Sequence, residues 1–191
     1  MDLRQRLFQY RSFTPIPFLI AMIILAKPTL TSMLAGFFIV LAGESLRLWG
    51  VSIAGSETRT TDTAGGTFLI TRGPFAYVRN PLYLGNLLMY LGIGIMSNVL
   101  WLALAALIFF YCQYALIVSL EEEYLARAFK EEFSRYCASV PRFLPTVKRY
   151  RAGSNPQPDP DVRRGLRSEK RTLQAIGLLA SLLIVIWRLK G

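Results

Sequence analysis

The chain has 191 residues, of which 53% are hydrophobic and 18% charged, and its mean hydropathy is +0.37. These values exceed those of most soluble domains of this length, so they indicate membrane segments. The formal net charge is +10 and histidine is absent, which excludes imidazole bases, histidine metal ligands and a Ser-His-Asp triad. Cys112 and Cys137 give neither a CxxC motif nor a zinc-ligand spacing, and we interpret both as plain thiols.

Uncharged apolar runs predict a helical membrane protein, because about 20 helical residues cross a bilayer core of about 30 Å. We expect about five transmembrane helices, over residues 13–26, 31–53, 81–96, 99–120 and 172–187. The last either crosses the bilayer or lies in its interface. The predicted fold class is therefore all-α: an integral-membrane helical bundle in one domain, residues 1–191. It comprises a core at 31–150, a connector at 151–171 rich in Pro, Gly and Asp, and a C-terminal apolar helix at 172–189.

The positions of Lys and Arg predict the orientation of the bundle. No small-residue cleavage site follows the first apolar stretch, so we expect that stretch to be retained as a span. Basic residues concentrate before it, in the loop at 55–79 and in the segment at 121–171. The positive-inside rule then places all three in the cytoplasm. No aromatic stacking platforms are interleaved with these charges, so we do not expect a nucleic-acid partner.

The segment "EEEYLARAFKEEFSRYCASV" predicts a cytoplasmic amphipathic helix. Its apolar residues recur at steps of three and four, which places them on one face: Leu125, Phe129, Phe133, Tyr136 and Val140. We expect this face to lie under the bundle or along the membrane surface.

Two ionisable residues, Glu44 and Arg47, fall inside the second predicted span at a three-residue step. An ionisable residue at membrane depth is costly and suggests a functional site. Alternatively, the two side chains pair with each other and only stabilise the helix.

The stretch "RGPFAYVRNPLYLGN" crowds turn-forming and polar residues at the start of the third predicted span. Pro81 suits a first helical turn, where backbone N–H groups have no partner within the helix. With Arg72, Arg79, Tyr77 and Tyr83, these groups would form a polar recess for a small ligand that has a carboxylate and a ring. Alternatively, the Arg and Tyr side chains form an ordinary interfacial belt.

These motifs also resemble a known family in their order and spacing. "TRGPFAYVRNPLYLG", followed by "EEEYLARAFKEEFSRYCASVPRFLP" and preceded by "GESLRLWG", is similar to the isoprenylcysteine carboxyl methyltransferase and phospholipid methyltransferase superfamily. The matching blocks run from Gly43 to Pro145. The resemblance implies an integral-membrane methyltransferase that binds S-adenosyl-L-methionine in a cytoplasmic-side pocket. Its expected cofactor-binding residues, carried over by position, are Thr67, Phe68, Leu69, Ile70, Phe75, Asn80, Pro81, Leu82, Tyr83 and Glu122.

The sequence departs from the family pattern at three places. Asn80 replaces the His of Arg-His-Pro, so a His-dependent proton transfer is excluded while cofactor contact is not. Lys130 replaces the Gly of Phe-Gly, which we expect to be a mild change at an exposed position. No Arg precedes Glu121, although the carboxyl methyltransferases have one there to hold the substrate carboxylate, so a farnesylcysteine substrate is not supported.

The expected reaction is methyl transfer to a hydrophobic or lipid-like acceptor, with a carboxylate as one possible acceptor. Such an in-line displacement depends mainly on positioning in a dry site. The expected catalytic residues are Glu122 and Glu121, which bind the cofactor or accept a proton from an amine or hydroxyl acceptor; a carboxylate acceptor needs no base. We expect Glu122 to contribute most to cofactor binding, because Glu123 points away from the apolar stripe.

Two other functions compete with the methyltransferase. Sterol-reductase-type proteins share a segment similar to "RNPLYLG" and bind a nicotinamide cofactor, but they are usually larger. A non-enzymatic scaffold whose basic surface binds anionic membrane lipids would leave Asn80 and Glu122 unexplained. The sequence predicts no metal ligand set, and it does not indicate an oligomeric state.

Overall fold

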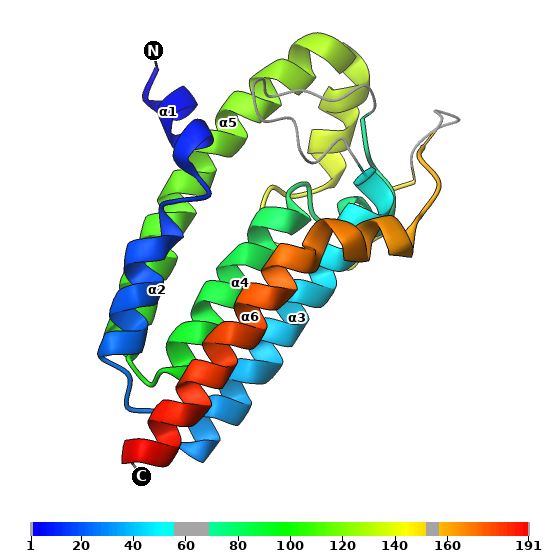
Figure 1. The fold of residues 1–191 in the computed structure, drawn as a ribbon. Coiled ribbons are helices and arrows are strands. Elements are labelled where there is room, and N and C mark those ends of the chain that lie inside the picture. The colour runs from blue at the N-terminus through cyan, green and yellow to red at the C-terminus, as the bar shows by residue number, and fades with distance from the viewer. Residues whose placement is uncertain (1, 56–68, 152–156, 191) are drawn as a thin grey trace.

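A computed structural model describes residues 2–55, 69–151 and 157–190. Their helices are α1 (Leu3–Tyr10), α2 (Pro15–Ile24), α3 (Leu30–Ala54), the 3₁₀ turn η2 (Gly73–Ala76), α4 (Pro81–Met96), α5 (Leu100–Ser139) and α6 (Val162–Lys190). Figure 1 shows α2 beside the apolar half of α5, and α3, α4 and α6 as a second group of roughly parallel rods. The prediction of an all-α bundle is confirmed for the described part of the chain.

The helix lengths fit a membrane protein. Among the described helices, α3, α5 and α6 are long and apolar enough to cross a membrane, and α1 with α2 passes as one pair bent by 54°. Helix α4 is apolar but shorter. Each of the five segments predicted to span the membrane is helical in the structure, so about five spans is roughly consistent with it.

The most extensive helix pair, α3 with α4, is held together by glycines. A Cβ atom added at Gly43 would lie 2.7 Å from the carbonyl oxygen of Gly85, and one added at Gly92 would lie 2.7 Å from that of Gly36. Only glycine allows backbones to approach this closely, and such contacts are a usual source of helix association in lipid. The α3–α4 pair therefore forms the rigid wall on which the site is built.

Helix starts follow local signals in the sequence. Thr29 and Ser32 form a capping box at the start of α3, with the Ser32 N–H donating to the Thr29 hydroxyl at 3.1 Å. Pro81 stands at the start of α4 as predicted. At the start of α6, the Arg164 N–H donates to the Asp161 carboxylate at 2.9 Å, which also lowers the pKa of that carboxyl below its usual value.

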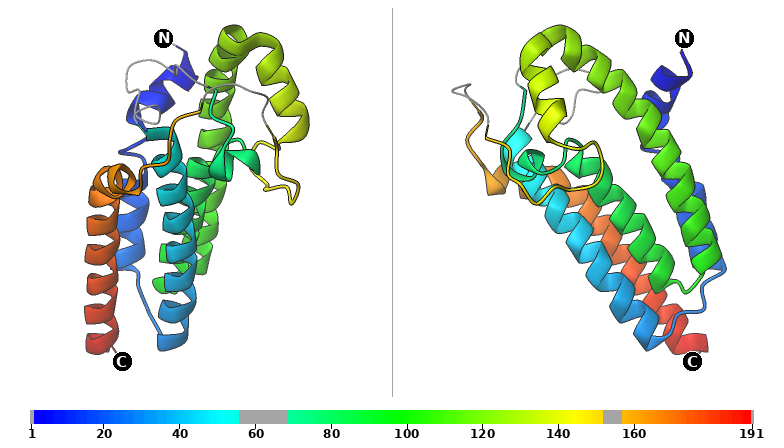
Figure 2. Two further views of the ribbon diagram at one scale, coloured as in Figure 1. Left: turned by 90° about the vertical axis from the view of Figure 1, so that its right-hand side faces the viewer. Right: turned by 180° about the vertical axis from the view of Figure 1, so that it is seen from behind.

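The amphipathic segment differs from the prediction in its continuity. It is not a separate helix but the last part of α5, which runs from Leu100 to Ser139 with a break at Lys130, where φ is 43° and ψ is −116°. The apolar stripe itself is confirmed, because Phe133, Tyr136 and Val140 are buried in one cluster with Leu69. The break turns this end of α5 back toward the bundle, as Figure 2 shows.

The change at Lys130 is not mild, contrary to our expectation. The side chain is exposed as predicted, but its positive φ lies in a region that L-residues rarely adopt and glycine tolerates. Sequence reasoning judged the position by exposure alone and missed the backbone requirement.

Helix α6 begins well before the apolar segment predicted at 172. It starts at Val162, so residues 162–171, assigned to the connector, are helical. From there α6 runs beside α3 (Figures 1 and 2). Leu183 is fully buried in the core of the bundle. The polar residues of "VRRGLRSEKR" obscured this helix start because they carry no apolar periodicity.

The two predicted loops meet at one end of the bundle, here called the loop end, where η2, the end of α5 and the start of α6 gather (Figure 1). The Arg79 N–H donates to the Pro141 carbonyl at 2.9 Å, and the Thr146 N–H donates to the Tyr77 carbonyl at 2.9 Å. The Asp161 N–H donates to the Ser52 carbonyl at 2.8 Å. These backbone bonds join segments that are far apart in sequence into one structural unit.

Candidate functional site

A cavity of about 780 Å³ opens between the helices. Part of its wall is apolar and aromatic and comes from the loop end: Leu69, Ile70, Phe75, Phe133 and Tyr136. Another part comes from helices inside the bundle, including Met89 and Ile93 of α4 and Ile176 and Leu179 of α6. The cavity thus joins the loop end to the apolar interior.

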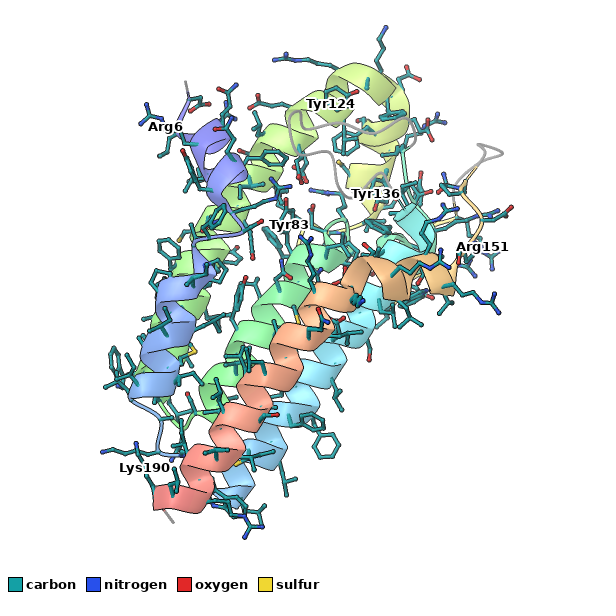
Figure 3. All side chains as sticks on the ribbon, in the orientation of Figure 1. Arg6, Tyr83, Tyr124, Tyr136, Arg151 and Lys190 are labelled. Carbon is teal, nitrogen blue, oxygen red and sulfur yellow. The ribbon has the colours of Figure 1, made fainter. Side chains whose placement is uncertain are left out.

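The predicted site residues come together around this cavity. All those that the structure describes line it: Leu69, Ile70, Phe75, Asn80, Pro81, Leu82, Tyr83, Glu121 and Glu122. The two others, Thr67 and Phe68, lie outside the described residues. Figure 3 shows Tyr83 of α4 and Tyr124 and Tyr136 of α5 near the same opening, whereas Arg6 points away from it.

The conformation of the stretch before α4 depends on one glycine and two side-chain clamps. Gly73 has φ of +60°, and a Cβ there would lie 2.8 Å from Ile53, so the Gly of "RGPF" is required by conformation and space. The Tyr136 hydroxyl donates to the Phe75 carbonyl at 2.7 Å. Gln157 donates to the Leu69 carbonyl and accepts from the Thr71 N–H, both at 2.9 Å. The cavity wall at 69–75 is therefore fixed from three directions.

Glu122 stands where three sequence motifs converge. Its carboxylate forms an ion pair with Arg79 of "VRNP" at 3.0 Å and a second one with Arg142 of "PRFLP". Arg79 also donates to the carbonyls of Val140, at 2.7 Å, and Cys137, at 3.1 Å. Sequence reasoning did not assign Arg142 to the site, although its place in the closing Pro-Arg-x-x-Pro block was the available signal.

Asn80 links the same motifs through its side-chain amide. Its Nδ2 donates to the Arg142 carbonyl at 3.1 Å, and the residue lines the cavity. Its Oδ1 accepts no hydrogen bond from the described residues, so it remains as an acceptor for a ligand.

Glu121 lies on the cavity wall with a different partner. The Tyr83 hydroxyl donates to its carboxylate at 2.8 Å, and the Tyr83 ring lies against that of Tyr114 at 4.6 Å between centroids. The Tyr114 hydroxyl is within hydrogen-bond distance of Tyr90, at 3.3 Å, and accepts from Asn86 at 3.2 Å. A carboxylate and a run of tyrosines therefore extend from the predicted site toward the interior.

Glu123, by contrast, is exposed and does not line the cavity. It forms an ion pair with Arg4 and so ties α1 to α5. The three neighbouring glutamates therefore face different surroundings, as the helical periodicity predicts.

The contacts of Glu44 and Arg47 agree in part with both predictions for this pair, a functional site and a helix-stabilising ion pair. Glu44 and Arg47 lie 3.8 Å apart, as expected for a helix-stabilising pair. Arg47 also donates to Asn86 and to Glu169 of α6, both at 2.6 Å, and it lines the cavity. Arg47 is therefore part of the site wall, whereas Glu44 is buried behind it. Glu169 and Asn86 were not predicted, because their pairing depends on how α6 packs.

Some residues of the predicted polar recess fit a ligand site, and others fit an interfacial belt. Arg79 and Tyr83 line the cavity, whereas Arg72 and Tyr77 do not. Tyr77 instead packs near Trp49, with ring centroids 6.4 Å apart, and Arg72 is exposed. Those two residues fit an interfacial belt better than a ligand site.

Comparisons with known proteins bear on this cavity. Residues 31–132 match the model of a family described as phospholipid methyltransferase. The chain is 35% identical over 109 residues, 56% of its length, to the cobalt-zinc-cadmium resistance protein CzcN of Cupriavidus metallidurans. It is 33% identical over 88 residues, 46% of its length, to the nickel-cobalt-cadmium resistance protein NccN of Alcaligenes xylosoxydans xylosoxydans. These alignments cover 46% and 41% of the two relatives. No solved structure matches the chain significantly.

Proposed function

The chain belongs to the phospholipid methyltransferase family, and on that premise we propose that it is an integral-membrane, S-adenosylmethionine-dependent methyltransferase with a hydrophobic or lipid-like acceptor. The observation that carries this proposal is the convergence at Glu122. There the "VRNP", "EEEYL" and "PRFLP" motifs meet through the ion pairs of Arg79 and Arg142 on one wall of the cavity. Motifs that are distant in sequence but share one polar centre are expected of a binding site.

The cavity fits the proposed cofactor in size and chemistry. Its volume of about 780 Å³ falls within the range of about 300–1,000 Å³ typical of small-molecule sites. Apolar and aromatic side chains at the loop end suit a purine ring: Leu69, Ile70, Phe75, Phe133 and Tyr136. The Oδ1 of Asn80 and the carboxylates of Glu121 and Glu122 suit amino and hydroxyl groups and a cationic centre.

We assign roles to these side chains as follows. Leu69, Ile70 and Phe75 hold the ring, and Asn80 and Glu122 bind the polar groups, with Glu122 oriented by its two arginines. The bound cofactor supplies an electrophilic methyl group on a sulfonium. Glu121, held by the Tyr83 hydroxyl, accepts the proton when the acceptor is an amine or a hydroxyl, and it is not needed as a base when the acceptor is a carboxylate.

The shape of the cavity also supports the lipid-like acceptor. Its interior wall combines Met89 and Ile93 of α4 with Ile176 and Leu179 of α6, all apolar. An acceptor that enters from the bilayer would meet the cofactor near Tyr83 and Glu121. The apolar surroundings exclude water and position the reacting groups, which is the main requirement of methyl transfer. We place the loop end in the cytoplasm, because its loops carry most of the basic residues and basic loops usually face the cytoplasm.

The two relatives have names that concern metal resistance. Among the described residues, no group of three or more His, Cys, Asp or Glu side chains could hold a metal ion. The proposal rests on family membership and on the convergence at Glu122, not on those names.

The test is calorimetry of the full chain in neutral detergent with S-adenosylmethionine, S-adenosylhomocysteine and NADPH. We expect saturable binding of the two sulfur compounds and none of NADPH. Saturable NADPH binding without binding of either sulfur compound would overturn the proposal and favour a reductase. A second readout is transfer of a tritiated methyl group from S-adenosylmethionine to the organic-extractable fraction of vesicles that contain the protein.

A further inference from the structure

The family match leaves part of the cavity wall unassigned. It covers residues 31–132, but α1, α2 and α6 lie outside that range and still line the cavity. Phe8 and Arg11 contribute at the end of α1, and Ile16 and Leu19 contribute from α2. Part of the wall that faces the proposed acceptor therefore lies outside the segment that the family match covers.

Two cationic residues, Arg11 and Arg171, belong to this added wall, and Arg11 is the half-buried one, whereas Arg171 is exposed. The Arg11 guanidinium lies over the Phe8 ring at 3.9 Å from the centroid, and its Nη1 donates to the Phe8 carbonyl at 2.5 Å. The side chain is half-buried at the junction of α1 and α2. A guanidinium has five N–H donors, so most of them are left over for a partner. Within the described part of the chain, no carboxylate forms an ion pair with Arg11.

The other charged groups near Arg11 already have partners. Glu121 and Tyr83 line the same cavity as Arg11 and are hydrogen-bonded to each other. Arg47 is paired with Glu169, and the remaining acid of the wall, Glu122, is paired with two arginines. Among the described residues, no carboxylate forms an ion pair with the Arg11 guanidinium, so its remaining N–H donors bring positive charge to the same cavity that Glu121 lines.

The surroundings of Arg11 indicate what kind of anion it accepts. From Arg11 the wall continues along α2 through Pro15, Ile16 and Leu19, which are apolar, and Ile176 and Leu179 of α6 also line the cavity. A cation followed by an apolar channel suits an anionic head with a hydrocarbon tail. It does not suit the polar nucleoside and amino-acid parts of the cofactor.

We propose that Arg11 is a specificity-determining residue that binds a carboxylate or phosphate group of an amphiphilic acceptor, whose hydrocarbon part lies between α2 and α6. The identification of this ligand as the acceptor rests on the proposed function. The guanidinium is well suited to binding such a group, because its paired N–H groups match the two oxygens of either anion.

The test measures amphiphile binding without any cofactor. Purified full-length protein in neutral detergent is incubated with tritiated hexadecanoate, and hexadecanoate, hexadecyl phosphate, hexadecanol and hexadecylamine are compared as competitors. We expect one or both anions to compete at least ten-fold better than the alcohol or the amine, and the better anion identifies the headgroup. Arg11→Gln should weaken anion binding about ten-fold to a hundred-fold, whereas Arg11→Lys should retain part of it.

Arg6→Gln is the matched control. Arg6 lies on the same helix, is exposed, and points away from the cavity (Figure 3), so it removes the same charge without touching the site. Equal competition by hexadecanol, or equal losses in Arg6→Gln and Arg11→Gln, would overturn the proposal. Weaker S-adenosylmethionine binding in Arg11→Gln with unchanged anion binding would overturn it too, because Arg11 would then serve the cofactor. Failure to bind S-adenosylmethionine in the wild-type protein would instead reject the methyltransferase function.

Discussion

The Glu122 carboxylate lies 3.0 Å from the Arg79 guanidinium, and both side chains are largely buried, with exposed fractions of 15% and 13%. Arg142 completes the group as a second cation on the same carboxylate. One acid between two arginines leaves a net positive charge beside the cavity. Glu122 therefore serves two purposes, because it can contact a ligand and it also joins the segments at 79 and 142.

We predict that replacing Glu122 weakens cofactor binding more than replacing either neighbour. Glu122→Gln removes a charged acceptor and releases Arg79 and Arg142, so S-adenosylmethionine affinity should fall about ten-fold to a hundred-fold, or about 1.5–3 kcal/mol. Glu121→Gln should have a smaller effect on affinity, and with an amine or hydroxyl acceptor it should have a larger one on methyl transfer. Calorimetry on each purified variant measures the first effect, and the tritium transfer assay measures the second.

Glu123→Gln is the control for this series, because Glu123 is exposed and paired with Arg4 outside the cavity. It should bind the cofactor like the wild-type protein. The site assignment would be wrong if Glu123→Gln had the largest effect, or if Glu122→Gln bound normally.

The sequence predicted most of the helices and the composition of the cavity wall, because both depend on local patterns. Apolar runs located all five apolar helices, and motif order placed Asn80, Tyr83 and Glu122 on one wall. Periodicity alone separated Glu121 and Glu122 from Glu123. The helices and the orientation of the three glutamates require knowledge of one helix at a time, whereas the grouping of Asn80, Tyr83 and Glu122 came from the resemblance to a known family.

The features that sequence reasoning missed depend on tertiary packing. The partners of Glu122 and Arg47 include Arg142 and Glu169, which lie on other elements. Arg11 lines the cavity because α1 packs beside α5. No pattern in the sequence predicts this helix contact. The break at Lys130 was missed because the α5 pattern continues through it on both sides.

We predict that the close α3–α4 contact is essential for stability. Gly43→Leu places a side chain against the Gly85 carbonyl oxygen, only 2.7 Å from a Cβ at that position, and backbone cannot move aside cheaply. Such overpacking costs about 1–3 kcal/mol or more, so the melting temperature in detergent should fall by several degrees. Gly177→Leu is the control, because a Cβ there has no heavy atom within 4 Å. Equal melting temperatures for the two variants would contradict the close packing.

We predict that Arg47 is needed for stability because it is the shared cation of two buried carboxylates, Glu44 and Glu169. Arg47→Gln leaves Glu44 and Glu169, with exposed side-chain fractions of 7% and 2%, without their shared cation. Breaking a buried ion pair in this way costs about 3–5 kcal/mol. Arg164→Gln removes the same charge from an exposed pair with Asp161 and should cost about 1 kcal/mol or less. Thermal unfolding of both variants in detergent tests this difference, and similar losses would refute the buried network.

We predict that the loop end faces the cytoplasm. In a variant without the native cysteines, new cysteines at Arg72 and Ser139 should react with a membrane-impermeant maleimide only after cells are permeabilised. A cysteine at Lys27, which is exposed in the connection between α2 and α3 at the other end of the bundle, should react in intact cells. Labelling of Arg72→Cys or Ser139→Cys in intact cells would overturn the orientation.

The break in α5 at Lys130, which the sequence did not predict, leads to a prediction about stability. Lys130 has φ of 43°, and holding a residue with a Cβ in such a conformation costs about 1–3 kcal/mol. Lys130→Gly removes that strain, although glycine loses more chain entropy on folding, by about 0.5–1 kcal/mol. Because the side chain is exposed and forms no ion pair among the described residues, the strain relief should dominate.

Lys130→Gly should therefore raise the melting temperature in detergent by a few degrees. Arg127→Gly is the control, because Arg127 is also exposed and basic but lies in the helical part of α5 before the break. Glycine there should destabilise by about 1 kcal/mol. If both substitutions lowered the melting temperature equally, residue 130 would not have the positive φ, and α5 would run straight past the site instead of turning Phe133 and Tyr136 into the cavity wall.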